Sequence, residues 1–193
     1  MRLCDHAGVA WVAMLRGINV GGARRMPMLA LRELHAELGH ERVQTYVQSG
    51  NVVFSTPRSA RPAQLAQEIQ AAIAERFGLD DVDVVIRRGD ELRRVVAENP
   101  FIAAGRDPAH LHVTFLAQAI SQVTIASLDA SQHAPEEIAP TATEIYLYAP
   151  NGLGRSALTK VVDERRLGTR STTRNWRTVH ALLRLVEGQQ GAE

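Results

Sequence analysis

The sequence has few cysteine and aromatic residues and almost no net charge, and these shortages exclude several classes of protein. Cys4 is the single cysteine among 193 residues, so no intrachain disulfide can form. The first residues lack the apolar segment of a secretory signal, and no apolar run reaches the roughly 20 residues that a membrane-spanning helix needs. We therefore expect a soluble cytoplasmic protein without a membrane partner.

The charge and apolar content are those of an ordinary globular protein. A formal net charge of +1 excludes a highly basic nucleic-acid binder by total charge alone, although arginines clustered on one face can still form a positive patch. An apolar fraction of 45% supports a sizeable core, and the length suits one large domain or two small ones. The distribution of charge along the chain is therefore more informative than its sum.

The first half has the hydrophobic pattern of a ferredoxin-like fold. An apolar run at 9–15 predicts a buried strand, and leucines at helical spacing predict a helix that begins at Pro27. Alternating residues on either side of Ser49-Gly50 predict a β-hairpin, which a second helix and a strand at 82–86 follow. This βαββαβ order predicts two helices on one face of an antiparallel four-stranded sheet.

The second half predicts a further α+β subdomain, so we expect a ferredoxin-like subdomain at 1–88 and a second one at 89–193. Its expected elements are a helix at 90–98, a strand at 111–115, a helix at 120–128, paired strands at 137–140 and 144–148, and two C-terminal helices, at 158–168 and from Trp176 onwards. The second half would then be a degenerate copy of the first, with a helix in place of its last strand.

A glycine-rich basic loop follows the first strand, with the sequence Leu15-Arg16-Gly17-Ile18-Asn19-Val20-Gly21-Gly22-Ala23-Arg24-Arg25. Its glycines permit positive φ and close backbone approach, and the N–H groups at the start of the next helix favour an anion. The glycine separation is that of a Walker A loop, but Ala23-Arg24 stands where lysine and serine or threonine should follow. The pattern therefore predicts an anion site that is not a P-loop.

Three more segments combine small residues with polar donors at element boundaries: Gln48–Asn51, Asn151–Ser156 and Thr172–Trp176. The stretch from Arg155 to Arg177 is also locally basic, with seven cations against Asp163 and Glu164. The candidate ligand-binding residues are Arg16, Gly17, Asn19, Gly21, Gly22, Ser49, Gly50, Asn51, Gly152, Arg155, Ser156, Thr173, Arg174, Asn175 and Trp176.

Catalytic and metal-binding patterns are weaker than this anion-binding pattern. His110 and His112 would project to one strand face, but no cysteine or carboxylate has the spacing of a further metal ligand. Ser49 and Ser156 lie in glycine-bounded turns outside the nucleophile-elbow pattern. The catalytic residues stay unknown, no cofactor or metal is expected, and turn chemistry alone is an alternative explanation of the glycines and asparagines.

Four segments together resemble a known family. They are the glycine loop from Leu15 to Gly22, Gln48-Ser49-Gly50-Asn51-Val52-Val53-Phe54, Pro150-Asn151-Gly152 with Gly154-Arg155-Ser156, and Thr172-Thr173-Arg174-Asn175-Trp176. They are similar to the signatures of a widespread bacterial family catalogued as a domain of unknown function. The resemblance implies a cytoplasmic α+β protein and brings no activity, substrate or catalytic residue. In that family a lysine commonly follows the serine of the third segment, where this chain has Ala157.

The leading hypothesis is a module that binds a phosphorylated or otherwise anionic ligand, such as a nucleotide or a nucleic-acid backbone, at a cleft between the two halves. Sequence-specific RNA stacking is disfavoured, because only Trp11 and Phe54 are aromatic candidates on the middle strands. Two alternatives remain open. One is an enzyme that acts on a phosphorylated small molecule, and the other is a protein-interaction module with purely structural loops and an unknown oligomeric state.

Overall fold

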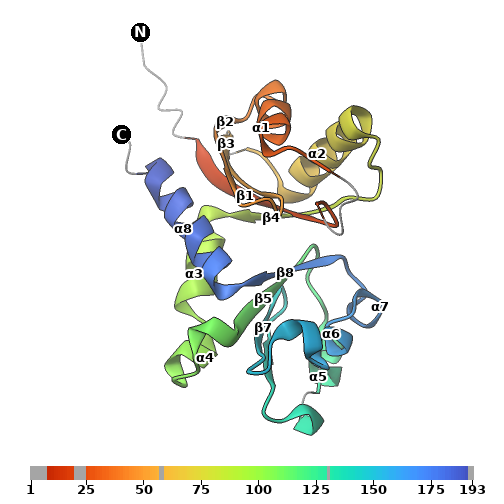
Figure 1. Cartoon of the computed structure of the whole chain (residues 1–193), viewed down its shortest axis with the longest axis vertical. Coiled ribbons are helices and arrows are strands. Elements are labelled where there is room, and N and C mark those ends of the chain that lie inside the picture. The colour runs from red at the N-terminus through yellow and green to blue at the C-terminus, as the bar shows by residue number, and fades with distance from the viewer. Residues whose placement is uncertain (1–7, 20–24, 57–58, 130, 191–193) are drawn as a thin grey trace. The chain divides into compact units, whose positions relative to one another are not determined.

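The computed structural model describes residues 8–19, 25–56, 59–129 and 131–190. The chain forms two units, each with its own four-stranded antiparallel sheet (Figure 1), so the α+β class is confirmed. Unit 1 comprises Met1–Leu92 and Leu182–Glu193, and unit 2 comprises Arg93–Ala181. The chain passes from one unit to the other within α3 (Gly89–Ala97) and again within α8 (Trp176–Gln190). The last turns of α8 therefore belong to unit 1.

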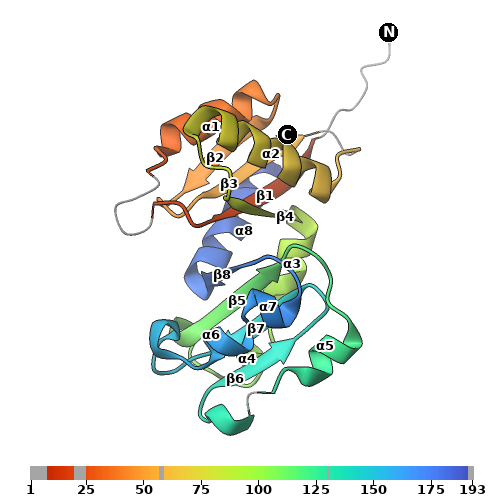
Figure 2. The ribbon, with the colours of Figure 1, turned by 90° about the vertical axis from the view of Figure 1, so that its right-hand side faces the viewer.

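Unit 1 has the predicted βαββαβ order, and its strands lie in the order β2-β3-β1-β4. Figures 1 and 2 show α1 and α2 on the same face of this sheet. The elements are β1 (Val9–Arg16), α1 (Met28–Glu37), β2 (Glu41–Tyr46), β3 (Asn51–Thr56), α2 (Pro62–Phe77) and β4 (Asp83–Arg88).

The core of unit 1 lies between the helices and one face of the sheet. Alternate residues of β1, which include Trp11 and Leu15, point to this face and are buried, because side chains alternate across a strand. Leu31 of α1 and Ile69 of α2 pack against the same cluster, as the helical spacing of their apolar residues predicts. Burial of this apolar surface is the main source of the unit's stability.

Unit 2 repeats the topology of unit 1, with its strands in the order β6-β7-β5-β8. Leu158, Val161 and Leu167, from α6 and α7, pack with Ile145 and Leu147 of β7 on one face of the sheet. The elements are α4 (Pro100–Ala103), β5 (Leu111–Leu116), α5 (Gln122–Ser127), β6 (Glu137–Pro140), β7 (Glu144–Tyr148), α6 (Leu158–Val161), α7 (Glu164–Leu167) and β8 (Ser171–Asn175), with 3-10 turns at Pro108–His110, Ser131–His133 and Leu153–Arg155.

The expectation that a helix replaces the last strand of the second half was wrong, because β8 is that strand. It pairs with β5 along its whole length, and Thr173 shares a hydrogen bond of 2.9 Å between hydroxyl groups with Thr114. Asn175, rather than Thr172 or Thr173, caps α8, since its Oδ1 accepts from the backbone N–H of Thr178 at 2.8 Å. β-Branched threonines suit an edge strand, and their side chains bond across it.

The last turns of α8 bind the edge of the sheet in unit 1 through Gln189. Its Oε1 accepts from the hydroxyl of Ser55 at 2.9 Å, and its Nε2 donates to the carbonyl of Arg42 at 2.7 Å. Arg42 lies in an irregularity between β2 and β3, with a φ of 51°, so its carbonyl is turned out of the regular ladder. Gln189 thus supplies the partner that the neighbouring strand does not.

We expect Gln189→Ala to lower the free energy of unfolding by about 1–3 kcal/mol, because it leaves a buried hydroxyl and a carbonyl without partners. Urea denaturation followed by circular dichroism measures this. Gln64→Ala is the control, since the amide of Gln64 bonds to Glu68 at the surface of α2. Equal stability of the two variants would contradict the role given to Gln189.

Candidate functional site

Two of the predicted ligand segments meet in unit 1. The backbone N–H of Leu15 donates to the carbonyl of Gly50 at 2.8 Å, and the Nδ2 of Asn19 donates to the carbonyl of Gln48 at 2.9 Å. Asn19 also bonds both backbone groups of Met26, since its Nδ2 donates to the carbonyl at 3.0 Å and its Oδ1 accepts from the N–H at 2.8 Å. Asn19 therefore links Met26, which precedes α1, to the β2–β3 turn.

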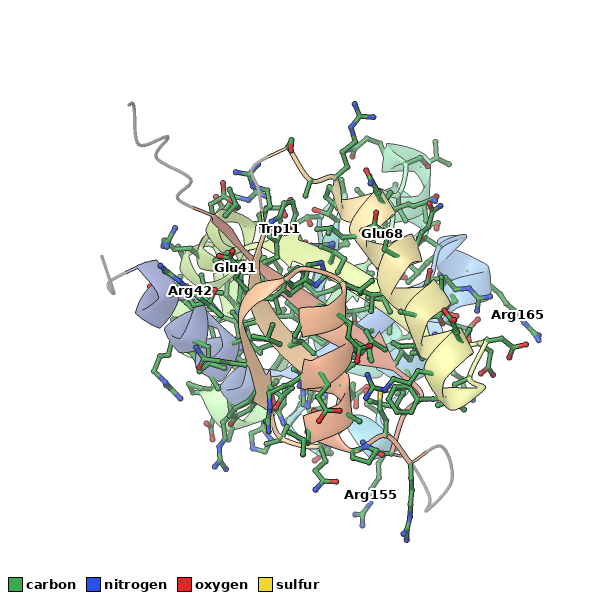
Figure 3. All side chains as sticks on the ribbon, turned by 90° about the horizontal axis from the view of Figure 1, so that it is seen from above. Trp11, Glu41, Arg42, Glu68, Arg155 and Arg165 are labelled. Carbon is green, nitrogen blue, oxygen red and sulfur yellow. The ribbon has the colours of Figure 1, made fainter. Side chains whose placement is uncertain are left out.

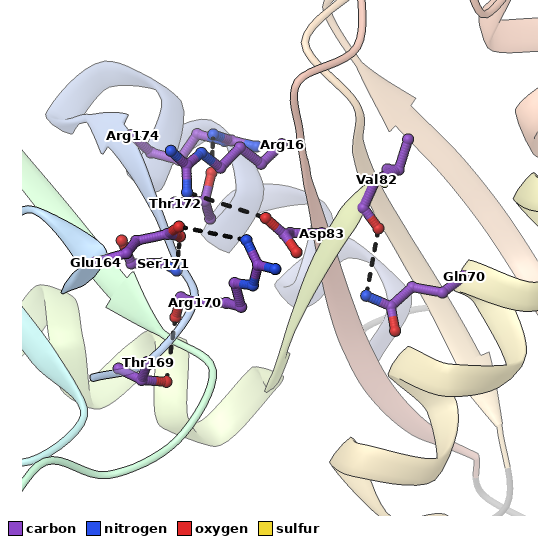
Figure 4. Close-up of polar contacts among 10 residues, drawn as sticks. All are labelled: Arg16, Gln70, Val82, Asp83, Glu164, Thr169, Arg170, Ser171, Thr172 and Arg174. Atoms are coloured by element: carbon purple, nitrogen blue, oxygen red, sulfur yellow. Dashed lines mark hydrogen bonds and ion pairs between the residues drawn. The ribbon is translucent and has the colours of Figure 1, made fainter. Parts of the chain in front are cut away.

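The other residues of these two segments also have structural contacts. Gly50 has a φ of 70° and lies directly against Leu15 and Ile18. Asn51 is fully buried, and its Nδ2 donates to the hydroxyl of Ser49 at 2.7 Å. Arg16 is exposed at the end of β1 and forms an ion pair of 3.9 Å with Asp83 (Figure 4). Gly17 follows with a φ of 78°, while Gly21 and Gly22 lie outside the described residues.

The other two predicted segments lie at one end of the sheet in unit 2. Leu111, at the start of β5, is opposite Tyr148 at the end of β7, and the next residue, His112, is opposite Asn175 at the end of β8. Because both neighbouring strands run antiparallel to β5, the segments that follow them leave the sheet at the same end. Gly152 and Arg155 are exposed there, and Figure 3 shows the side chain of Arg155 pointing away from the ribbon.

Several polar groups of this second pair are already bonded within unit 2. The hydroxyl of Ser156 is buried and accepts from the N–H of Leu158 at 3.0 Å, at the start of α6. Arg174 is half-buried, and its Nη1 donates to the hydroxyl of Thr172 at 2.7 Å. Burial lowers the pKa of Arg174 to about 10, so it remains a cation at neutral pH. Trp176 is buried edge-on to His180, with 4.8 Å between ring centroids.

An open hollow of about 580 Å³ lies at the opposite end of the sheet in unit 2, and none of its residues is among the predicted ligand residues. It forms where the end of β5 meets the start of β8, since the N–H of Ala117 donates to the carbonyl of Arg170 at 2.8 Å and that of Gln118 to the hydroxyl of Thr169 at 3.1 Å. Its lining residues are Ala117, Gln118, Glu164, Arg165, Gly168, Thr169 and Arg170.

The hollow has two exposed arginines and one carboxylate on its rim. The Oε1 of Glu164 accepts from the N–H of Ser171 at 2.7 Å, and its Oε2 lies 3.6 Å from a guanidinium nitrogen of Arg170 (Figure 4). Arg165 lies at the start of α7, where Asp163 caps the helix, and Figure 3 shows its side chain pointing into solvent. In the sequence, this site is indicated by the basic stretch from Arg155 to Arg177. That stretch contains Arg165 and Arg170 but does not distinguish them from its other cations.

No group of three or more histidine, cysteine or acidic side chains among the described residues could hold a metal ion. His112 lies partly buried, which lowers its pKa, and its Nδ1 is 3.3 Å from the carbonyl of His110. Among the same residues, no helix is both long and apolar enough to cross a membrane. The arrangement thus offers charge and hydrogen bonds to a ligand.

The fold and the hollow define a two-unit α+β protein with a basic surface depression. The chain belongs to the family described as Protein of unknown function (DUF1697), whose model matches residues 9–146. It is similar to a solved structure, the conserved bacterial protein SP0830 from Streptococcus pneumoniae, with 23% identity, a TM-score of 0.71, and coverage of 92% of this chain and 98% of that one. That likeness shows the fold alone. A search of curated proteins finds no match.

Proposed function

We propose that this protein binds a phosphorylated or otherwise anionic ligand, such as a nucleotide or a nucleic-acid backbone, in the hollow of unit 2. The observation that carries the proposal is the pairing of two exposed arginines with a hollow of about 580 Å³. Pockets for small molecules have volumes of roughly 300–1,000 Å³, so the hollow suits a ligand of nucleotide size.

Arginine is well suited to this role, because its planar guanidinium donates two parallel hydrogen bonds to a phosphate or carboxylate. The side chain of Arg170 keeps 69% of its surface exposed, and its 3.6 Å contact with Glu164 is longer than a good charge-assisted hydrogen bond. The ion pair that breaks when Arg170 turns from Glu164 toward a ligand phosphate is therefore weak and solvated. Arg165 adds a second cation on the same rim.

Glu164 makes the site more selective than two arginines alone. Its Oε1 is held by the N–H of Ser171, so the carboxylate stays in place when Arg170 moves. A carboxylate beside a phosphate repels extra negative charge but accepts from hydroxyl or amino groups. The hollow therefore favours a ligand that carries such a donor next to its phosphate, as nucleotides and sugar phosphates do, over inorganic phosphate.

The test measures binding of AMP, ATP, ribose 5-phosphate, inorganic phosphate and a short single-stranded oligonucleotide by calorimetry at low and physiological salt. We expect Arg165→Gln and Arg170→Gln each to weaken binding about tenfold, and each to reduce the salt dependence by about one counterion for a nucleic-acid ligand. Arg184→Gln removes the same charge from an exposed position of α8 and serves as the control.

Two outcomes would overturn the proposal. One is that none of these probes binds the wild-type protein at low salt. The other is that a probe binds but loses no more affinity in the two hollow variants than in the Arg184→Gln control, which would place the ligand elsewhere.

A further inference from the structure

Two histidines face each other in the core of unit 1. His35 lies on the inner side of α1, and His40 lies between α1 and β2; both are buried. Their Nδ1 atoms are 3.0 Å apart. Both rings also pack on Phe54 of β3, with His40 stacked at 4.3 Å and His35 edge-on at 5.0 Å between ring centroids. The pair therefore joins α1 to the middle of the sheet.

This geometry requires at least one of the two imidazoles to be neutral. Two nitrogens 3.0 Å apart form a hydrogen bond only when one carries a proton and the other accepts it. Protonation of one ring places a positive charge in an apolar core, and protonation of both rings also sets two N–H groups against each other. The Nε2 of His35 is buried with no hydrogen-bond partner in the described part of the chain, so a proton there also has no acceptor.

We propose that His35 and His40 form a proton-sensitive lock, which stabilises the docking of α1 on the sheet of unit 1 at neutral pH and loses this stabilising effect as the pH falls below about 6.5. The lock joins residues five positions apart on one short segment, and the backbone N–H of His40 also donates to the carbonyl of His35 at 3.0 Å. Opening it therefore moves α1 and the start of β2 together.

The charged groups around the pair do not cancel the lowering of the two histidine pKa values by burial. Burial, with a smaller contribution from the nearby His40, lowers the pKa of His35 to about 3. Burial also lowers the pKa of His40, while Glu68 on α2 acts in the opposite direction. Glu41 and Arg42, which follow on β2, are exposed (Figure 3), and Phe54 presents an apolar ring from β3.

The sign of the pH dependence follows from these directions. In the unfolded chain both histidines titrate near 6.5, whereas the folded protein holds protons less tightly, so acid favours the unfolded state. The stabilisation is complete above about pH 6.5 and is lost as the pH falls toward the folded pKa values. For His35 alone, the unfolding equilibrium constant should rise roughly twentyfold between pH 7 and pH 5.

The experiment combines two measurements on the full chain. Histidine ring signals in NMR spectra should show one side chain, His35, that stays neutral at about pH 5 in the folded protein, and a second, His40, whose midpoint lies below 6.5. Urea denaturation at both pH values should show that the double variant His35→Leu with His40→Phe loses most of the wild-type pH dependence. His110→Gln, which changes a partly exposed histidine, should keep it.

The proposal fails if His35 and His40 both titrate near 6.5 while the protein remains folded. It also fails if the folded double variant has the same pH dependence as the His110→Gln control. Should the double variant not fold, the NMR titration of the wild-type protein still decides the question.

Discussion

Replacing Gly50 with alanine is expected to destabilise the protein by about 3 kcal/mol or more, a large part of the roughly 5–15 kcal/mol that holds a typical domain folded. A Cβ at this position would lie 2.6 Å from the Cδ1 of Ile18 and 2.8 Å from the Cβ of Leu15. Both neighbours are buried, and Leu15 also bonds the carbonyl of Gly50 through its backbone. The contact cannot be relieved without breaking the junction of the two loops.

Two costs combine at Gly50, and a control separates them. The φ of 70° costs a side chain roughly 1–2 kcal/mol, and overpacking a buried site costs about 1–3 kcal/mol more. Gly78→Ala carries the first cost alone, because Gly78 has a φ of 65° but no atom within 4 Å of its Cβ position. Urea denaturation of both variants gives the two free energies, and an equal loss in both would show that the packing against Ile18 and Leu15 is unimportant.

The packing around Gly50 accounts for the ligand-site pattern of the Gln48–Asn51 segment. The local structure requires these residue types. Gly50 packs too closely against Ile18 for a side chain to fit, and Asn51 hydrogen-bonds to Ser49. Asn19 likewise has a structural role, because its side chain donates hydrogen bonds to the carbonyls of Gln48 and Met26. Glycines and amides at a turn therefore indicate a constrained backbone, and sequence alone does not separate this role from ligand binding.

Unit 1 was predictable because its signals are local. Each helix has an apolar stripe at helical spacing, and each strand alternates or is apolar throughout. β8 was missed because Ser171–Asn175 is a short polar segment, and what makes it a strand is its pairing with β5, more than fifty residues earlier in the chain. Long-range pairing of this kind leaves no periodic pattern in the sequence.

The hollow could not be assigned for a related reason. Its walls come from the turn after β5, from α7 and from the segment that joins α7 to β8. Two hydrogen bonds, from Ala117 to the carbonyl of Arg170 and from Gln118 to the hydroxyl of Thr169, bring these walls together. Composition identified the basic stretch correctly, but exposure separates its members: Arg174 is half-buried on β8, whereas Arg165 and Arg170 reach solvent. Only the three-dimensional arrangement selects those two arginines.

The second large effect is expected where α3 begins beside the end of α8. A Cβ on Gly89 would lie 2.5 Å from the Cγ1 of Val186, and Ala10 closes the other side, with its carbonyl oxygen at 3.4 Å. Val186 is buried and stiff at χ1, so it has no free space to turn into. We expect Gly89→Ala to cost about 1–3 kcal/mol by overpacking, although alanine is a better helix former than glycine.

A double-mutant cycle tests the cause of that loss. Val186→Ala removes the methyl group that the new Cβ would meet. The double variant should therefore lose about 0.5–3 kcal/mol less unfolding free energy than the two single variants lose together. Gly188 lies two residues after Val186 on α8, where a Cβ would meet open space, so Gly188→Ala should stabilise α8 by up to about 1 kcal/mol. Opposite signs at two glycines near the same helix would show that close packing, and not helix propensity, requires glycine at position 89. Additive losses in the cycle would instead show that Val186 is not the cause of the cost at Gly89.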